Sequence, residues 1–398
     1  MSWRGITMRT RVVAVVVILF STIFMPHSNG EISQEISYCD FISDLQFDGE
    51  AANNSVQFQT SLGPRTPNSN ASYELRESIK ENLTGWEITE SVHYSGGYLL
   101  TNLFAKWNAG AGSTVILAAH YDTRDRADQD PNESRRSEPI LGANDGASGV
   151  AVLLELARII PSMNLSHEIM LFFTDGEDQG NSNQTPSYAL GAKAWSENLS
   201  QEEADNFESF ILVDMVGDIE LNLKPTWLGD STLWNRTTEM AVSLGIDNQR
   251  PGCDGENGTG VYQSDSYQNV FDDHIFALQV GIPAIDIIDI SYGVDAEPWK
   301  GHWHTVNDTA DKVSAESLEI VGELVELGLR TGAWLDIRKD IIIDNSSIDE
   351  EDNNSTDTDE IVSETGSQTT IGIFIMSSLL LVLGILLWIF IAEKRGEG

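Results

Sequence analysis

The sequence predicts an α/β fold, a three-layer sandwich in which helices flank a mostly parallel central sheet, plus a C-terminal transmembrane helix. Short apolar runs alternate with helical patterns between residue 31 and about residue 337. Three of the runs, at residues 114–119, 168–174 and 210–216, consist mostly of Val, Ile, Leu, Met and Phe. Strands of this composition are typically covered on both faces, as in a parallel sheet with helices on either side.

Two further strands are predicted, one at residues 98–105 before the central three and one at residues 284–290 after them. The helix predicted at residues 149–160 has apolar residues at helical spacing, so one apolar stripe faces the sheet. At the end of the unit, residues 314–335 predict an amphipathic helix, with Ser314 as its N-cap.

Apolar segments near both ends of the chain indicate export and membrane attachment. Residues 1–30 combine three arginines, a short apolar run and small residues at its exit, which predicts a secretory signal peptide. An uncleaved membrane anchor is the alternative for this segment. Residues 371–392 carry no charge and are long enough to cross about 30 Å of hydrocarbon as a helix.

The stretches beside the predicted span give its orientation. Residues 338–370 are rich in Asp, Glu, Asn, Ser and Thr and contain no aromatic residue, which predicts a disordered acidic stalk. Residues 393–398, the predicted tail, contain a lysine and an arginine. Because positive charge marks the cytoplasmic side, we expect a single-pass membrane protein whose folded domain, residues 31–337, lies outside the cytoplasm.

The formal net charge of the chain is -39. This charge argues against nucleic acid as a partner, because phosphate backbones are bound by clusters of Lys and Arg. Most of the acidic side chains are expected on a solvated surface. The cysteines are Cys39 and Cys253, too few for a Cys-based zinc site, so a metal ion must be held by His, Asp and Glu. Whether the two cysteines pair is open at this point.

Acidic and imidazole side chains follow the predicted strands and open one of the predicted helices. They come from five separate segments and are His120 and Asp122, Asp145, Glu177 and Asp178, Asp214, and His304. In open parallel sheets, ligands bind where the carboxyl ends of the strands meet. Carboxylates gathered there repel one another, and divalent cations remove that repulsion. Histidine with Asp or Glu and no Cys suits catalytic zinc.

Three motifs resemble those of a known family. They are Gly-Ala-Asn-Asp-Gly-Ala-Ser-Gly at residues 142–149, Asp-Gly-Glu-Asp at residues 175–178 and His-Thr-x-x-Asp-Thr at residues 304–309. Together they resemble the co-catalytic zinc aminopeptidases and the offshoot of that family, the glutaminyl-peptide cyclotransferases. The resemblance covers about residues 60 to 335.

The resemblance implies two zinc ions per chain that share one carboxylate. It assigns five ligands: His120, Asp145, Asp178, Asp214 and His304. Asp145 would bridge the ions, with His120 and Asp214 on one side and Asp178 and His304 on the other. His304 is preferred to His302 as a ligand because Thr305 and Asp308 follow it.

Two more residues receive catalytic roles from the resemblance. Glu177 would be the general base that takes a proton from metal-activated water, and Asp122 would fix the tautomer of His120 from behind. Asp178 departs from the family pattern, because both branches more usually have Glu at this position. The shorter side chain moves this ligand inward by about one bond.

We therefore predict a zinc-dependent exopeptidase of the aminopeptidase type that removes N-terminal residues from peptides. A glutaminyl-peptide cyclotransferase is the alternative, since Trp303 directly before His304 and Asp273 in an Asp-Asp-His sequence are similar to that branch and would line its pocket. An inactive homologue that binds partners at a surface is the second alternative. The oligomeric state is not predicted.

Overall fold

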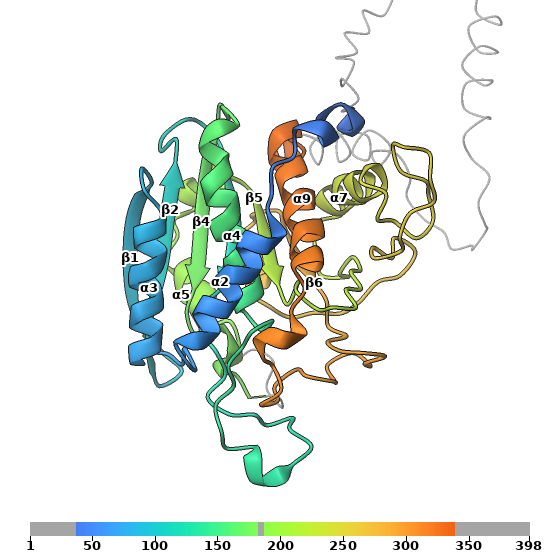
Figure 1. The fold of residues 1–398 in the computed structure, drawn as a ribbon. Helices are drawn as coiled ribbons and strands as arrows, with labels where there is room; N and C mark the ends of the chain where they lie inside the picture. Colours follow the sequence, from blue (N-terminus) through green and yellow to red (C-terminus); the bar gives the residue numbers. More distant parts are fainter. Residues whose placement is uncertain (1–36, 182–186, 339–398) are drawn as a thin grey trace, which may run out of the picture. The chain divides into compact units, whose positions relative to one another are not determined.

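The computed structural model describes residues 37–181 and 187–338, in which six strands form one sheet. The strands are β1 (Glu87–Ser95), β2 (Tyr98–Trp107), β3 (Thr114–His120), β4 (Glu168–Thr174), β5 (Phe207–Asp214) and β6 (Ala284–Ile288). Their order across the sheet is β1-β2-β4-β3-β5-β6 (Figure 1). β3 is parallel to β4 and β5, and β6 is parallel to β5.

The sheet is mixed, so the prediction of a mostly parallel sheet is wrong in this respect. β2 pairs antiparallel with both β1 and β4. The edge strand β1 was not predicted, because its residues are exposed or half-buried throughout and form no apolar run. A tight turn at Gly96 and Gly97, both with positive φ, joins β1 to β2 and makes their pairing antiparallel.

The predicted transmembrane helix is not found in the described part of the chain. Within residues 37–181 and 187–338, no helix combines the length and apolar character needed to cross a membrane. The predicted span at residues 371–392, the signal peptide at residues 1–30 and the tail at residues 393–398 lie outside the described residues, as does the stalk from residue 339 onward. The assignment of these segments therefore stays a prediction of the sequence alone.

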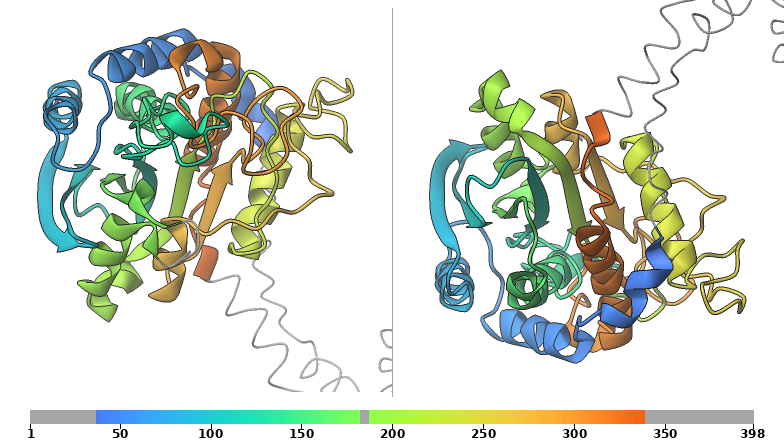
Figure 2. Two further views of the ribbon diagram at one scale, coloured as in Figure 1. Left: turned by 90° about the horizontal axis from the view of Figure 1, so that it is seen from below. Right: turned by 90° about the horizontal axis from the view of Figure 1, so that it is seen from above.

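Helices cover both faces of the sheet (Figure 2). One layer contains α2 (Gly49–Ser61), α3 (Asn70–Asn82), α4 (Ala147–Ile159), α7 (Ser231–Ser243) and α9 (Ala315–Thr331). The opposite layer contains α5 (Leu190–Glu197), α6 (Gln201–Asn206) and α8 (His274–Gln279). Short 3-10 turns are η1 (Tyr38–Asp44), η2 (Glu133–Arg135), η3 (Ile160–Ser162), η4 (Glu177–Gln179) and η6 (Ala310–Lys312).

The central strand β3 faces a core on each side. Val115 and Leu117 pack into the core beneath α2, α4 and α9, while Ile116 and Ala118 pack into the core beneath α5 and α8. Every residue of β3 is buried. This alternation explains why an uninterrupted apolar run correctly predicted a strand that is covered on both faces.

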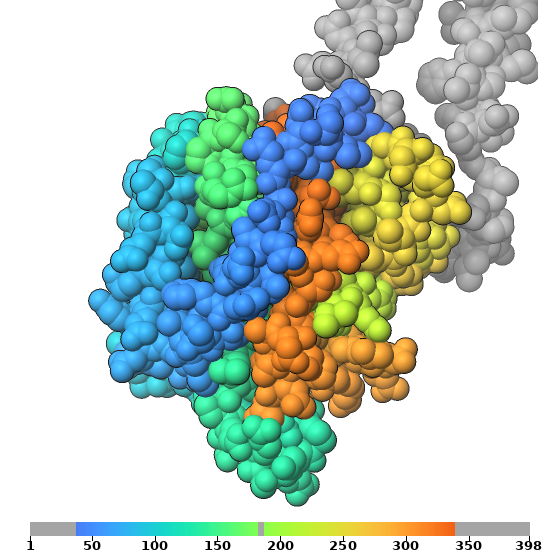
Figure 3. Space-filling view, viewed as in Figure 1, coloured from blue at the N-terminus to red at the C-terminus, as the bar shows by residue number. Residues whose placement is uncertain are grey.

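The two predicted helices correspond to α4 and α9. Ser314 is the N-cap of α9 as expected, because its side chain accepts a hydrogen bond from the backbone N–H of Ser317. α4 lies close against the sheet, since a Cβ at Gly149 would collide with the carbonyl oxygen of Val213 in β5. α2 packs on α4 and α9, and it lies beside α9 in Figures 1 and 3.

The two cysteines form a disulfide, which answers the question that the sequence left open. The bond joins Cys39 in η1 to Cys253 in the loop after α7, with 5.7 Å between the Cα atoms. η1 also contacts α7 and α9. The disulfide therefore ties the start of the described chain to the β6 end of the domain.

Candidate metal centre and active site

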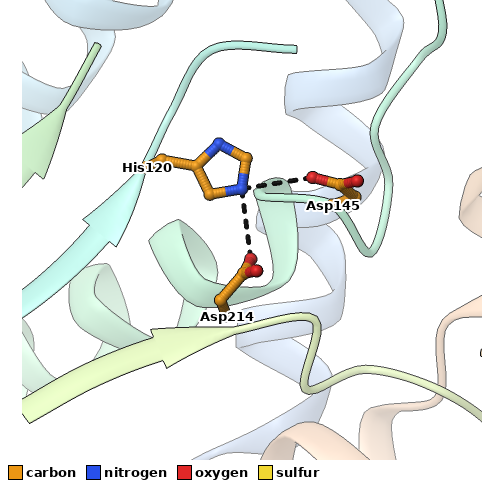
Figure 4. Close-up of side chains that lie close together, drawn as sticks. All are labelled: His120, Asp145 and Asp214. Carbon is orange, nitrogen blue, oxygen red and sulfur yellow. Dashed lines mark hydrogen bonds and ion pairs between the residues drawn. The ribbon is translucent and has the colours of Figure 1, made fainter. Parts of the chain in front are cut away.

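The carboxyl ends of two parallel strands and two loops bring the first polar side chains of the site together. His120 is the last residue of β3 and Asp214 is the last residue of β5. Asp145 lies in the loop before α4, and His304 lies in the long connection between β6 and α9. Figure 4 shows the His120 ring pointing toward the carboxylates of Asp145 and Asp214.

His120, Asp145 and Asp214 form the first candidate metal-binding group. His120 Nε2 lies 3.2 Å from Asp145 Oδ1 and 3.1 Å from Asp214 Oδ1. Two ligand atoms that are each about 2.0 Å from a tetrahedral zinc ion lie about 3.3 Å apart. The three side chains are buried, and each offers a ligand atom within 4.8 Å of the other two.

Asp145, Asp178 and His304 form the second candidate group. His304 Nε2 lies 2.9 Å from Asp178 Oδ1 and 3.7 Å from Asp145 Oδ2. Asp145 thus presents one carboxylate oxygen to each group, which is the arrangement that a bridging ligand requires. The shorter side chain of Asp178 still reaches this group.

Asp122 holds the first group from behind. Its Oδ1 lies 3.5 Å from His120 Nδ1 and accepts a hydrogen bond of 3.0 Å from the backbone N–H of Glu177. Its Oδ2 accepts a hydrogen bond of 2.9 Å from Gln179 Nε2. Asp122 therefore fixes both the imidazole at the end of β3 and the loop after β4.

Two residues that the sequence analysis missed hold the second group. Asp128 Oδ1 lies 3.3 Å from His304 Nδ1, on the opposite side of the ring from Asp178. Arg124 is fully buried and donates both to Asp128, at 2.8 and 2.7 Å, and to Asp178 Oδ1, at 3.2 Å. Both residues belong to the loop that carries η2, which stands out at this edge of the sheet (Figures 1 and 3). This loop has no hydrophobic periodicity, so the sequence did not indicate that Arg124 or Asp128 belongs to the site.

The loop that carries Asp145 is held by two further buried side chains, Asp308 and Arg65. Asp308 accepts hydrogen bonds from the backbone N–H groups of Asn144, at 2.8 Å, and Asp145, at 3.3 Å. Arg65 donates to the carbonyl oxygen of Gly142 at 2.8 Å. Burial raises the pKa of Asp308 to about 6, although these hydrogen bonds and Arg65 lower it.

Gly146, next to Asp145, permits the close approach of this loop to β3. A Cβ atom at this position would collide with the His120 ring and with the His120 carbonyl oxygen. A larger residue would therefore displace either His120 or the loop. The glycine in the motif has this steric role.

Glu177 and Trp303 line a cavity of about 630 Å³ at the two groups, as expected for the proposed base and a pocket residue. Burial and the neighbouring Asp272 raise the pKa of Glu177 well above its usual range. The Trp303 ring stacks on the His304 ring, with 3.5 Å between centroids.

Asp273 lies elsewhere than predicted, because Asp272 lines the cavity and Asp273 does not. The buried Asp273 carboxylate instead accepts a hydrogen bond from Thr174 Oγ1 at the end of β4. The two neighbours point in different directions at the start of α8, where Asp273 is the residue before His274. The sequence could not decide which of two adjacent acids faces the site.

The chemistry of the site fits zinc. Burial and the neighbouring Asp178 raise the pKa of Asp145 to about 7, as expected for carboxylates that repel one another. Divalent cations would relieve this repulsion and would suit a donor set of imidazole and carboxylate. Both cysteines are engaged in the disulfide, so they do not compete as ligands.

The sequence model of Peptidase family M28 matches residues 102–327. Among solved structures, the chain is 29% identical to glutaminyl cyclase from Porphyromonas gingivalis, with a TM-score of 0.60 and coverage of 70% of this chain and 96% of that one. It is 28% identical to a leucine aminopeptidase precursor from Bacteroides thetaiotaomicron, with a TM-score of 0.61 and coverage of 72% and 98%. A Zn-dependent exopeptidase from Parabacteroides distasonis is 26% identical, with a TM-score of 0.60 and coverage of 72% and 99%.

Proposed function

Since this chain belongs to peptidase family M28, we propose that it is a zinc-dependent enzyme that acts on the N-terminal residue of peptides. The observation that carries this proposal is the pair of His and Asp groups that share Asp145 at one wall of a cavity. Glu177 lines the same cavity and is the candidate base. Solved structures of similar chains include a Zn-dependent exopeptidase, which supports zinc as the metal.

We propose hydrolysis of the N-terminal peptide bond as the reaction. Two complete ligand groups support it, because two metal ions can hold an attacking water and the substrate carbonyl together. Zinc bound there would polarise the carbonyl and lower the pKa of the water. Glu177 takes a proton from the water while the water oxygen bonds to the carbonyl carbon. Glu177 then returns this proton to the amine, which leaves when the C–N bond breaks.

Cyclisation of an N-terminal glutamine is the second candidate. It is favoured by Asp272, a buried acid that lines the cavity together with Glu177, and by the similar glutaminyl cyclase. In this reaction, Glu177 takes a proton from the substrate α-amine, whose nitrogen bonds to the side-chain amide carbon. The proton then goes to the ammonia that leaves, and no water is consumed.

One assay distinguishes the two reactions. Peptides that begin with Gln or Leu are incubated with the zinc-loaded protein and analysed by mass spectrometry. Hydrolysis releases the free N-terminal amino acid from either peptide, whereas cyclisation removes one ammonia from the Gln peptide and leaves the Leu peptide intact. If the zinc-loaded protein changes neither peptide, the proposal is wrong.

The Glu177→Gln variant tests the assigned base. We expect zinc binding to persist and the rate to fall by a factor of about 10² to 10⁴, because a general base is removed without a metal ligand. Glu133→Gln is the matched control, since the Glu133 side chain is 85% exposed on η2. An unchanged rate in Glu177→Gln would exclude Glu177 as the base.

We also propose that the folded domain works in an oxidising compartment outside the cytoplasm. The disulfide between Cys39 and Cys253 supports this location, because disulfides persist mainly in exported proteins. Labelling of intact cells with a thiol reagent before and after reduction is the test. Free thiols before reduction would contradict the proposal.

A further inference from the structure

A single basic side chain lines the cavity. Within the described part of the chain, Lys300 is the one Lys or Arg among the lining residues, whereas five Asp and Glu side chains line the same cavity. Lys300 is exposed, and among residues 37–181 and 187–338 it has no ion pair. The chain has 62 acidic and 23 basic side chains, so a lysine without an acidic partner is unexpected. Because Lys300 has no such partner among the described residues, its charge is available to a ligand.

The backbone on both sides of Lys300 is fixed. The N–H of Trp299 donates to the carbonyl oxygen of Ile290 at 2.7 Å, and the N–H of His302 donates to that of Tyr292 at 3.0 Å. Gly301 has a φ of 73°, and a Cβ there would collide with the Tyr292 carbonyl oxygen. Lys300 therefore extends from an anchored segment at the cavity wall.

This segment is also joined to the candidate metal centre. The Trp299 and Trp303 rings pack with 4.9 Å between centroids, and Trp303 stacks on His304. All three rings line the cavity together with Lys300. The lysine thus has a defined position relative to the proposed ligand His304.

We propose that Lys300 determines specificity by binding a carboxylate of the peptide substrate, an inference that rests on the proposed function. The α-amine of a peptide is a cation, which the acidic part of the cavity attracts through side chains such as Asp272 and Glu177. A carboxylate further along a short peptide then meets the ammonium group of Lys300. A cavity of about 630 Å³ is in the range of small-ligand sites, so the substrate is a short peptide.

Two sources can supply this carboxylate, and a set of matched peptides distinguishes them. The set is X-Ala amide with no carboxylate, X-Ala with a free C-terminus, and X-Glu amide with an acidic side chain, where X is whichever of Leu or Gln the enzyme accepts. We expect kcat/KM for one or both carboxylate peptides to exceed that of X-Ala amide by about two- to five-fold, because an exposed ion pair is modest in water. The preference should lie mainly in KM and weaken at high salt.

The Lys300→Gln variant should abolish the preference, and Lys300→Glu should reverse it in favour of X-Lys amide. Lys193→Gln is the matched control, since Lys193 lies on α5 and does not line the cavity. If the enzyme acts on X-Ala amide and the kcat/KM ratios between the peptides are equal in the wild type and Lys300→Gln, the role of Lys300 is overturned and the proposed function stands. Absence of any turnover overturns the proposed function, and the inference falls with it.

Discussion

Replacement of Arg124 by Met should destabilise the domain far more than an ordinary arginine substitution. The Arg124 guanidinium is fully buried, and it donates to Asp128, to Asp178 and to the carbonyl oxygen of Gly180 at 3.1 Å. Its removal takes the guanidinium away from the buried carboxylate of Asp178, which keeps His304 as its remaining charged partner. Breaking a buried pair in this way costs about 3–5 kcal/mol, which is a large part of a typical unfolding free energy of about 5–15 kcal/mol.

Equilibrium unfolding in urea measures this loss. A chelator is present throughout, so that metal binding does not add to the free energy of unfolding. Arg126→Met is the matched control from the same loop, because the Arg126 side chain is 33% exposed and should contribute about 1 kcal/mol or less. Arg124→Lys keeps the charge but loses the planar fork, so it should fall between these values. Equal losses in Arg124→Met and Arg126→Met would refute the reasoning.

Three further predictions concern stability away from the site. Phe172→Ala should cost about 3–5 kcal/mol, measured by urea unfolding, because the fully buried ring is removed from the core beneath α5. Serine at both Cys39 and Cys253 should lower the unfolding free energy by up to about 5 kcal/mol, since the disulfide closes a loop with a sequence separation of 214. Burial raises the pKa of Glu168, but Lys106 and hydrogen bonds together lower it by a larger amount, so the pKa of Glu168 is lowered in the folded protein. Its contribution is complete above the unfolded pKa of about 4.3 and disappears as pH falls through the folded value, so Glu168→Gln should destabilise at pH 7 and this deficit should shrink below about pH 4.

Each of these predictions has an outcome that contradicts it. Phe58→Ala is the control for Phe172→Ala, because Phe58 is 44% exposed and its loss should change stability by less than about 0.5 kcal/mol. A loss in Phe172→Ala as small as this would contradict the first prediction. If the serine variant, the reduced wild type and the oxidised wild type all have the same urea midpoint, the disulfide does not stabilise the domain. A pH-independent deficit in Glu168→Gln would show that its ionised form is not favoured by folding.

The central part of the fold could be predicted from the sequence, whereas its edge could not. β3 and β4 are buried along their whole length, so burial on both faces appears directly as an apolar run. β1 pairs through its backbone with β2 and has no buried residue, so its side chains carry no such pattern. The sheet is mixed because β2 pairs antiparallel with both β1 and β4.

The same distinction holds for the candidate site. His120 and Asp214 follow apolar strands directly, so their convergence could be expected from the parallel pairing of β3 and β5. Arg124 and Asp128 reach the site from a loop whose path depends on tertiary contacts. The position of Asp272 in the cavity depends on the orientation of a single turn before α8, which the sequence does not encode locally.

The dispersal of the candidate ligands along the chain has a consequence for biosynthesis. His120 is made long before His304, and the shared Asp145 needs both partners to serve two metal ions. During translation, no nascent chain that ends before His304 could complete the second group. Metal acquisition would therefore be a late event that follows closure of the sheet, and would consolidate a domain that is already assembled.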